Sequence, residues 1–412
     1  MLQYVYHYIG EVCRLNQIHR YFLTLISCAL SGRTPPGADF SPEDWDALFS
    51  LAREQKVLPL IFEALCRAPG GRSLPQIPRL KREVISQVML QTQKTAQLHQ
   101  VLEALTAAGL QPLVVKGLVC RSLYPQGDHR PSTDEDILIP SDQFEECHSV
   151  LLSLGMIPEG DPASGAYEIP YRQKNGILYI ELHRSLFPPE SDAYGSLNRF
   201  FTRAHETAVS LQGIPTLEYT DNLFYLICHA FKHFLHSGFG LRQVCDIALF
   251  AQAYEARVHW PRLLELCRTI RAERFTAAVF RIGQNHLSLG AVPGVFQDIP
   301  GEEEPMLLDL LNAGIYGGAT MSRRHSSNIT LDAVTGEKGG RARSLRASLF
   351  PPAEKLEGRY PYLKEKPWLL PAAWVSRIGS YLRESSGDNS AADALKIGND
   401  RVELLRFYHI LP

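Results

Sequence analysis

Two aspartates separated by one residue are the first positions in this chain whose types and spacing suggest chemistry. Asp134 and Asp136 stand directly before an apolar run, 137 to 139, which is typical of a strand. Because side chains alternate along a strand, both carboxylates should leave the same face, with Cα atoms about 6–7 Å apart. Carboxylate oxygens suit Mg²⁺, and two such ions can stabilise the attacking and leaving oxygens of a phosphoryl-type displacement. The pair therefore predicts a site for divalent cations.

A third carboxylate comes from a second strand-like segment, ILYIELHR at 177 to 184. Alternation puts Tyr179, Glu181 and His183 on one face and the apolar side chains on the other. The apolar face can pack on helices while Glu181 faces a cleft. We expect Glu181 to complete the metal site, with His183 nearby in the cleft.

A strand-to-helix turn precedes the aspartates in sequence. The apolar run 112 to 115 ends in Lys116-Gly117, and a short segment, 118 to 124, follows. A glycine at such a turn lets backbone N–H groups approach phosphates, and Lys116 could add a point charge. The alternative for Lys116 is a lysine that ends a strand in solvent, and the sequence leaves both open.

Taken in order, these motifs resemble the bacterial nucleotidyltransferase-like family of the polymerase-β-type nucleotidyltransferases, whose substrates are largely unassigned. The matching residues are Lys116-Gly117, Tyr124-Pro125, Arg130-Pro131, Asp134-x-Asp136 and Glu181-Leu182-His183. Lys116-Gly117 stands where the wider superfamily has Gly-Ser, and Thr133 and Glu135 replace the small and apolar residues usual beside the aspartates.

The resemblance implies a metal-dependent enzyme that moves a nucleoside monophosphate from a nucleoside triphosphate such as ATP to an acceptor hydroxyl, with release of pyrophosphate. It implies two Mg²⁺ or Mn²⁺ ions held by the catalytic residues Asp134, Asp136 and Glu181. It also places Lys116, Gly117 and Arg130 at the nucleotide.

Three histidines lie on one stripe of a predicted helix over 221 to 236: His229, His233 and His236. Zinc sites on helices usually recruit a further ligand from a distant segment, and none is evident here. We therefore favour structural pairs with Asp246 or glutamates over a metal site. In the resembled family, His229, His233, Arg242 and Asp246 face the catalytic cleft.

The patterns predict an α+β fold with a small mixed sheet of about four strands and helices on one face. We divide the chain into an N-terminal helical region (1–110), the nucleotidyltransferase core (111–185), a C-terminal helical domain (186–312) and a final region (313–412). That final region combines a basic loop with a helical, proline- and aromatic-rich tail.

Local signals fix several elements of this fold. Ser41 and Asp44 form a capping-box pattern for a helix expected to run on to about residue 65. Gln55 and Lys56 on this helix could be functional, but we favour a solvated helix face for them. Asn175-Gly176 between two alternating runs predicts an antiparallel hairpin. Pro170 lacks an N–H, which favours an edge strand or a bulge for the first of those runs.

A basic segment, 321 to 346, carries six Lys or Arg residues against two acids. A loop of this kind could close over a triphosphate or bind an acidic acceptor. A solvated linker is an equally good interpretation.

The overall charge limits the partners. The 412 residues have a formal net charge of −2 and a pI of about 6.7, so no general attraction to nucleic acid or anionic membranes is expected. We expect a nucleoside triphosphate and an unidentified acceptor, which is a small molecule, a sugar or a protein. A toxin-like enzyme acting on tRNA is one alternative, and a non-catalytic nucleotide-binding module is another. Retention of all three carboxylates favours an enzyme.

Eight cysteines are spread along the sequence without a C-x-x-C pair or zinc-like spacing. This indicates reduced, buried thiols and a cytoplasmic protein. The first thirty residues lack the basic region of a secretory signal, and their longest apolar run, 21 to 30, is too short to cross a bilayer.

Overall fold

The structure is a computed structural model that describes residues 15–191, 193–236, 238–313, 360–363, 366–374, 376 and 391–411. The chain divides into two compact units. The first comprises Met1–Phe231 and Gly240–Gly314, and the second comprises Lys232–Phe239 and Ile315–Pro412. The predicted basic loop, 321 to 346, lies outside the described residues, and the four-region division stays a prediction.

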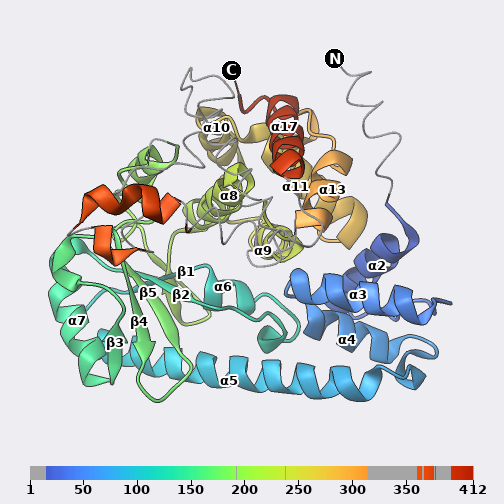
Figure 1. Ribbon diagram of the computed structural model, residues 1–412, viewed down its shortest axis with the longest axis horizontal. Helices are drawn as coiled ribbons and strands as arrows, with labels where there is room; N and C mark the ends of the chain where they lie inside the picture. Colours follow the sequence, from blue (N-terminus) through green and yellow to red (C-terminus); the bar gives the residue numbers. More distant parts are fainter. Residues whose placement is uncertain are drawn as a thin grey trace. The chain divides into compact units, whose positions relative to one another are not determined.

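The first unit contains a five-stranded mixed sheet, seen on the left of Figure 1, which confirms the α+β class. The strand order is β1-β2-β5-β4-β3, in which only β2 and β5 run parallel. The strands are β1 (Leu113–Val115), β2 (Glu135–Leu138), β3 (Met156–Pro158), β4 (Glu168–Gln173) and β5 (Tyr179–His183). The extra strand relative to the expected four is β3, whose three residues are too few to show an alternating pattern.

The parallel pairing of β2 with β5 brings together residues that are distant in sequence. Asp136 lies opposite Glu181, and Leu138 lies opposite His183. Parallel neighbours need a crossover connection, which here includes the helix α7 (Phe144–Ser153). The apolar side chains of Ile137 and Ile180 are fully buried, which fixes this register because a one-residue slip would turn them outward.

The hairpin predicted at Asn175-Gly176 is confirmed, since β4 and β5 pair antiparallel across it. The edge position expected from Pro170 is wrong, because β4 lies between β5 and β3. The physical reason is the shortness of β3, which ends at Pro158. Beyond that end, the Pro170 carbonyl accepts a hydrogen bond from the backbone N–H of Glu159 at 2.8 Å. No hydrogen bond of the sheet requires an N–H from Pro170 at this position.

Four helices precede the sheet: α2 (Gln17–Ser31), α3 (Pro42–Glu54), α4 (Leu58–Arg67) and α5 (Ile77–Ala107). The capping box at Ser41 and Asp44 is confirmed. The single long helix expected after it is wrong, because the chain breaks between α3 and α4, where Lys56 has a φ of 52°.

Gln55, at this break, is fully buried instead of lying on a solvated face. Its amide nitrogen donates to the Leu310 carbonyl at 2.9 Å, and its amide oxygen accepts from the Leu241 N–H at 2.8 Å. The side chain therefore satisfies backbone groups of two distant helices, which explains why a polar residue is tolerated in the interior.

The 31-residue helix α5 extends beneath both the N-terminal helices and the sheet (Figure 1). At about 46 Å it is long enough to contact α4, α7 and the short turn η2 (Gly127–His129). One helix thus connects the N-terminal region to the segment that leads into β2.

The remainder of the first unit is helical apart from a small hairpin, β6 (Val209–Leu211) and β7 (Ile214–Thr216), which the sequence analysis did not anticipate. The Thr216 hydroxyl donates to the Val114 carbonyl at 2.6 Å and so ties this hairpin to β1. The helices are α6 (Gly117–Arg121), α8 (Tyr219–His236), α9 (Leu241–Ala253), α10 (Trp260–Thr269), α11 (Glu273–Leu287), α12 (Gly294–Gln297) and α13 (Glu304–Ala313).

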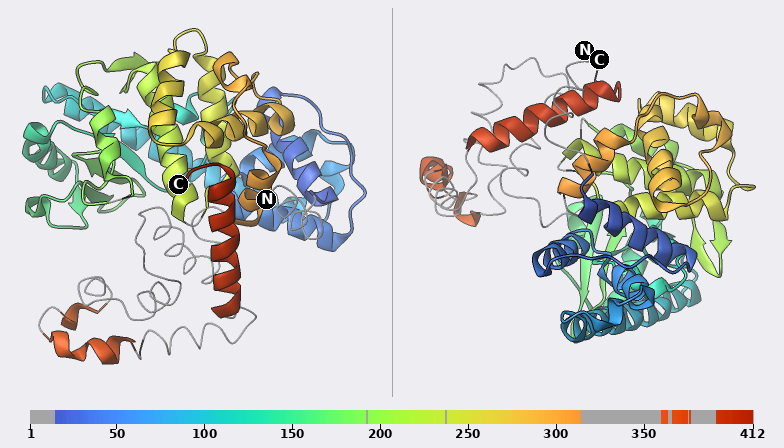
Figure 2. Two further views of the ribbon diagram at one scale, coloured as in Figure 1. Left: turned by 90° about the horizontal axis from the view of Figure 1, so that it is seen from above. Right: turned by 90° about the vertical axis from the view of Figure 1, so that its right-hand side faces the viewer.

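The second unit contains the last turn of α8 and the helix α17 (Ala391–Phe407), which is uninterrupted in Figure 2. Arg401 donates to the Phe234 carbonyl, and the Tyr408 ring packs edge-on against the Phe234 ring at 6.1 Å. A buried arginine and an edge-on pair of aromatic rings thus join α17 to the end of α8.

Two expectations about the protein's environment can be compared with the described residues. Seven cysteines fall within them, all are free thiols, and six are buried, in line with the sequence analysis. Within the same residues, none of the helices combines the length and apolar character that a membrane crossing requires.

Candidate functional site

The carboxylates of Asp136 and Glu181 meet the imidazole of His183 at the β2–β5 pair. One ligand atom from each residue lies within 4.8 Å of the other two, which is close enough to hold one metal ion. His183 Nε2 is 3.2 Å from Asp136 Oδ1 and 3.7 Å from Glu181 Oε2, and its Nδ1 is 3.5 Å from Glu168 Oε2. His183 is thus placed as a bridge between the two carboxylates.

Lys116 brings a positive charge to the same place. Its Nζ is 3.0 Å from Asp136 Oδ2, 3.7 Å from Asp134 Oδ2 and 3.2 Å from His229 Nε2. Only 15% of the side chain is exposed, so the alternative of a lysine ending its strand in solvent is wrong. Its backbone has φ 58° and ψ −123°, a conformation that costs energy in a residue other than glycine and is typical of functional turns.

The charges at this site influence one another strongly. Burial by itself would raise the pKa of Asp136, but the nearby Lys116 ammonium and the His183 hydrogen bond outweigh it and lower the pKa to about 2. Burial likewise opposes charge on His183, yet hydrogen bonds with Asp136 and Glu181 raise its pKa to about 9. The pKa of Glu181 is raised, first by burial. Glu181 is therefore the carboxylate of the group best suited to accept a proton.

Glu135 projects from the opposite face of β2 and is buried. Its carboxylate accepts from Arg121 at 2.6 Å and from the Ser132 hydroxyl at 2.6 Å. A Cβ at Gly117 would lie only 2.3 Å from Glu135 Oε2, and Gly117 has a φ of 31°. The turn therefore requires glycine, because the buried Glu135 side chain lies directly against it. The contacts of Glu135 with Arg121 and Ser132 explain why a glutamate stands between the two aspartates.

Arg130 and Asp246 form a buried bidentate ion pair, with N–O distances of 2.7 and 2.6 Å. The Tyr124 hydroxyl also donates to Asp246, at 2.8 Å, and Arg242 donates to the Pro131 carbonyl. The Arg130 charge is thus paired inside the protein next to the loop before Asp134, and the nucleotide contact inferred from sequence stays a prediction. Asp246 pairs with this arginine and not with the histidines of α8.

The histidine stripe of α8 does not act as one group. His229 lies at the site, with Nε2 near Lys116 and Nδ1 3.3 Å from the Gln243 amide nitrogen. His233 and His236 belong to the second unit. Among the described residues, the stripe is not part of any cluster with metal-ligand spacing.

Comparison with known protein families gives one match. The model of a family described as "Uncharacterised nucleotidyltransferase" matches residues 41–287, which is more than half of the chain and includes every site residue named above. The chain belongs to this family. The resemblance inferred from the sequence motifs is thereby confirmed.

Two further comparisons give no information about function beyond membership in this nucleotidyltransferase family. A search of curated proteins found no match. Among solved structures, the chain is similar to the solution structure of the antibiotic-resistance factor ANT(2'')-Ia, at 12% identity and a TM-score of 0.32. That match covers 45% of this chain and 95% of the other.

Sequence reasoning missed two lysines that contact the segment leading into β2 of this nucleotidyltransferase-family protein. Lys56 Nζ is 3.1 Å from the Thr133 hydroxyl, and Lys94 Nζ is 3.1 Å from the Ser132 carbonyl. For Lys56 the sequence favoured a solvated helix face over a functional role, and Lys94 lies on α5. The sequence carries no signal for Lys94, because its role depends on where α5 crosses the core.

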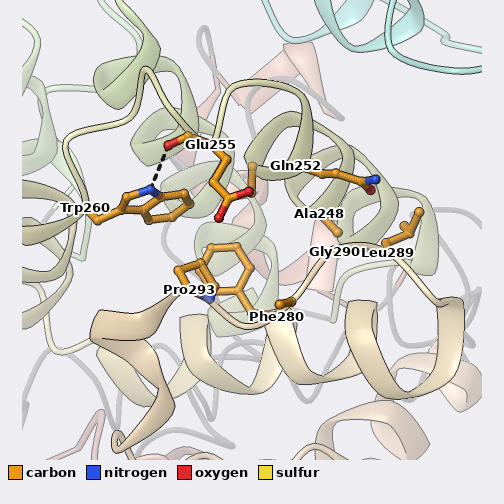
Figure 3. Close-up of a pocket in the computed structure, with 10 residues that line it drawn as sticks. Ala248, Gln252, Glu255, Trp260, Phe280, Leu289, Gly290 and Pro293 are labelled. Carbon is orange, nitrogen blue, oxygen red and sulfur yellow. Dashed lines mark hydrogen bonds between the residues drawn. The ribbon is translucent and has the colours of Figure 1, made fainter.

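A small pocket lies elsewhere in the first unit, between α9, α10, α11 and the loop that follows α11 (Figure 3). The Trp260 indole N–H donates to the Glu255 carbonyl at its rim, at 2.9 Å. The pocket shares no lining residue with the carboxylate site, so we do not assign it to the same chemistry.

Proposed function

We propose that this protein transfers a nucleoside monophosphate from a nucleoside triphosphate to an acceptor hydroxyl and releases pyrophosphate, with the help of divalent cations. The observation that supports this most is the parallel register of β2 and β5, which places Asp136 opposite Glu181. Asp134 stands two residues before Asp136, beside the same Lys116 ammonium. Family membership supports the general activity, and the carboxylate geometry supports the metal dependence.

The donor atoms fit a divalent cation. Asp136 and Glu181 offer carboxylate oxygens, which Mg²⁺ prefers, within one cluster with His183, and Asp134 adds a carboxylate beside the same Lys116 ammonium. When bound, such ions neutralise phosphate charge and lower the pKa of a coordinated hydroxyl. We propose that the three carboxylates hold them and that His183 fixes the orientation of Asp136 and Glu181.

The remaining residues of the site have distinct tasks in this proposal. Glu181, with its raised pKa, accepts the proton of the acceptor hydroxyl. Lys116 is held close enough to the carboxylates to approach the triphosphate that they bind. Gly117 leaves the first turn of α6 without a side chain. The phosphates can therefore approach backbone N–H groups there.

The direct test is incubation of the full chain with each of the four triphosphates, Mg²⁺ or Mn²⁺ and pools of small molecules, sugars and proteins. Pyrophosphate release and a mass increase of one acceptor by a nucleoside monophosphate are the expected results. Asp134→Asn serves as the inactive control. Triphosphate binding by calorimetry without pyrophosphate release in any pool would support the non-catalytic binding module instead.

Glu181→Gln tests the role assigned to this residue. It removes the proton-accepting group but keeps the size of the side chain, so turnover should fall by at least a hundredfold while triphosphate affinity changes much less. Steady-state kinetics and calorimetry with a non-hydrolysable triphosphate separate the two effects. A loss confined to triphosphate affinity would show that Glu181 serves the nucleotide and not the acceptor.

A further inference from the structure

Three cations from three different elements converge on the four-residue segment 131 to 134. Lys56 comes from the break between α3 and α4, Lys94 from α5, and Arg242 from the first turn of α9. Lys56 Nζ is 3.1 Å from Thr133 Oγ1, and Lys94 Nζ is 3.1 Å from the Ser132 carbonyl and 3.4 Å from that of Thr133. Arg242 donates to the Pro131 carbonyl. The segment ends at Asp134, which belongs to the carboxylate site.

These charges are close enough to repel one another. The pKa of Lys56 is lowered, first by burial and then by the positive charge of Arg242; Lys94 adds to the effect and Asp134 opposes it. The pKa of Lys94 is also lowered, first by burial; Glu135 and Asp134 oppose this shift, and Arg121 adds to it. An anion bound beside these groups would relieve the repulsion between them, because an opposite charge favours their protonated forms.

Two further observations point to a ligand at this place. Thr133 is the exposed residue of the segment, so the oxygen that Lys56 contacts is accessible from solvent. Lys56 is also held at a φ of 52°, and Lys116, on the other side of Asp134, is held at 58°. At Lys116 such a conformation is typical of functional turns, whereas at Lys56 it closes the C-terminal end of α3, where the Val57 N–H donates to the Ala52 carbonyl at 2.9 Å.

We propose that Lys56, Lys94 and Arg242 bind phosphate groups of a substrate beside Thr133 and Asp134. The proposal rests on the nucleotidyltransferase function proposed above and adds a site supplied by the helices on either side of the sheet. The phosphates are those of the triphosphate or of a phosphorylated acceptor. The competing explanation is purely structural: the three side chains only hold the loop.

The principal variant is Lys56→Gln combined with Lys94→Gln, which removes both ammonium groups and retains polar side chains of similar reach. Lys81→Gln, at an exposed position on α5, is the matched control. The probes are α,β-methylene analogues of the four triphosphates, inorganic pyrophosphate and tripolyphosphate, each titrated by calorimetry at two salt concentrations.

We expect the double variant to weaken binding of the triphosphate analogue at least tenfold and to reduce its salt dependence, while the control stays within twofold of the wild-type chain. If only the inorganic probes lose affinity, the site holds the phosphate of an acceptor. Unchanged affinity for every phosphate probe would overturn the proposal.

Two additional variants separate binding from loop support. Thr133→Val removes the hydroxyl that Lys56 contacts, so a purely structural role predicts a loss of thermal stability similar to that of Lys56→Gln. Lys56→Arg with Lys94→Arg keeps the charges and should retain more of the phosphate affinity than the glutamine variants. Equal losses of affinity in the arginine and glutamine pairs would overturn the proposal.

This test can fail independently of the proposed function. Suppose that the wild-type chain releases pyrophosphate and the double variant binds all probes normally. This result would refute the phosphate site but not the proposed nucleotidyltransferase function. A wild-type chain that neither binds nor turns over any triphosphate would refute the function itself.

Discussion

Asp134 and Asp136 are equivalent in the sequence pattern but lie in different environments. The Asp134 side chain is 31% exposed, whereas that of Asp136 is 3% exposed and lies between Lys116 and His183. An exposed carboxylate contributes little to folding, whereas a buried one that neutralises two cations contributes to stability as well as to function. The two positions should therefore respond differently to the same substitution.

Asp134→Asn should abolish nucleotide transfer and leave the melting temperature nearly unchanged. Asp136→Asn should abolish transfer and also lower the free energy of unfolding by about 1–3 kcal/mol, because a buried hydrogen bond to a charged partner is weakened. Pyrophosphate release and denaturant unfolding measure the two effects, with Asp142→Asn, at an exposed position, as the control. Full transfer activity in both variants would contradict the proposed metal site.

At the scale of elements, the loop that enters β2 is held from one side by α9 through Asp246. Both oxygens of this carboxylate accept from Arg130, and Tyr124 donates to it as well. All three side chains are buried, so the loop before Asp134 depends on a buried ion pair. Its position is consequently coupled to the packing of α9.

Asp246→Asn should destabilise the protein by about 3–5 kcal/mol, because it leaves the charge of Arg130 buried without a carboxylate. Arg130→Met combined with Asp246→Leu should recover part of this loss, since no unpaired charge remains. Denaturant unfolding of the single and double variants gives the comparison. Glu206→Gln, which breaks an exposed ion pair with Arg203, should leave stability nearly unchanged. Similar losses from Asp246→Asn and Glu206→Gln would refute the assigned role of the buried pair.

The break between α3 and α4 offers a second test at this scale. Lys56→Gly should raise the free energy of unfolding by up to about 1 kcal/mol, because glycine adopts a positive φ without strain. It should also weaken phosphate binding, because the ammonium is lost. Arg271→Gly, at an exposed position with a φ of 56°, should raise stability without changing the affinity for a triphosphate analogue. Equal affinities of the two variants for the triphosphate analogue would show that Lys56 does not contribute to substrate binding.

At the scale of the whole molecule, several half-buried histidines reduce stability in acid, whereas the buried His183, whose pKa is raised to about 9, acts in the opposite direction. Burial lowers the pKa of His19, His205, His236 and His286, and that of His236 falls to about 4, with Lys232 and Arg401 contributing. The folded protein therefore binds fewer protons at these positions than the unfolded chain, whose histidines titrate near pH 6.5. Stability from these groups is complete above that pH and is lost as the pH falls toward 4.

The melting temperature should accordingly decrease as the pH is lowered from 7 to 5. His236→Gln should reduce the size of this decrease, because the group that takes up a proton on unfolding is removed. His99→Gln, at an exposed position, is the control and should leave the decrease unchanged. Identical pH profiles for the wild-type chain and His236→Gln would refute the contribution assigned to His236.

The sequence by itself determined the features that depend on local order. The period-2 alternation around Asp134 and Glu181, the capping box at Ser41 and the Asn-Gly hairpin each involve residues close together in the chain. Steric and hydrogen-bonding rules act over such short separations whatever the rest of the molecule does. The three carboxylates and the strands that carry them could therefore be predicted before the structure was known.

Only the tertiary structure decided which polar groups meet across the core. Lys56 contacts Thr133 across 77 positions in the sequence, and Arg130 pairs with Asp246 across 116. A helical pattern tells which face of an element is polar, but the partner of each polar group depends on how the elements pack, and that is set by the combined burial of many apolar side chains. For this reason Gln55 was expected on a solvated helix face, until the packing of α9 and α13 placed it in the interior.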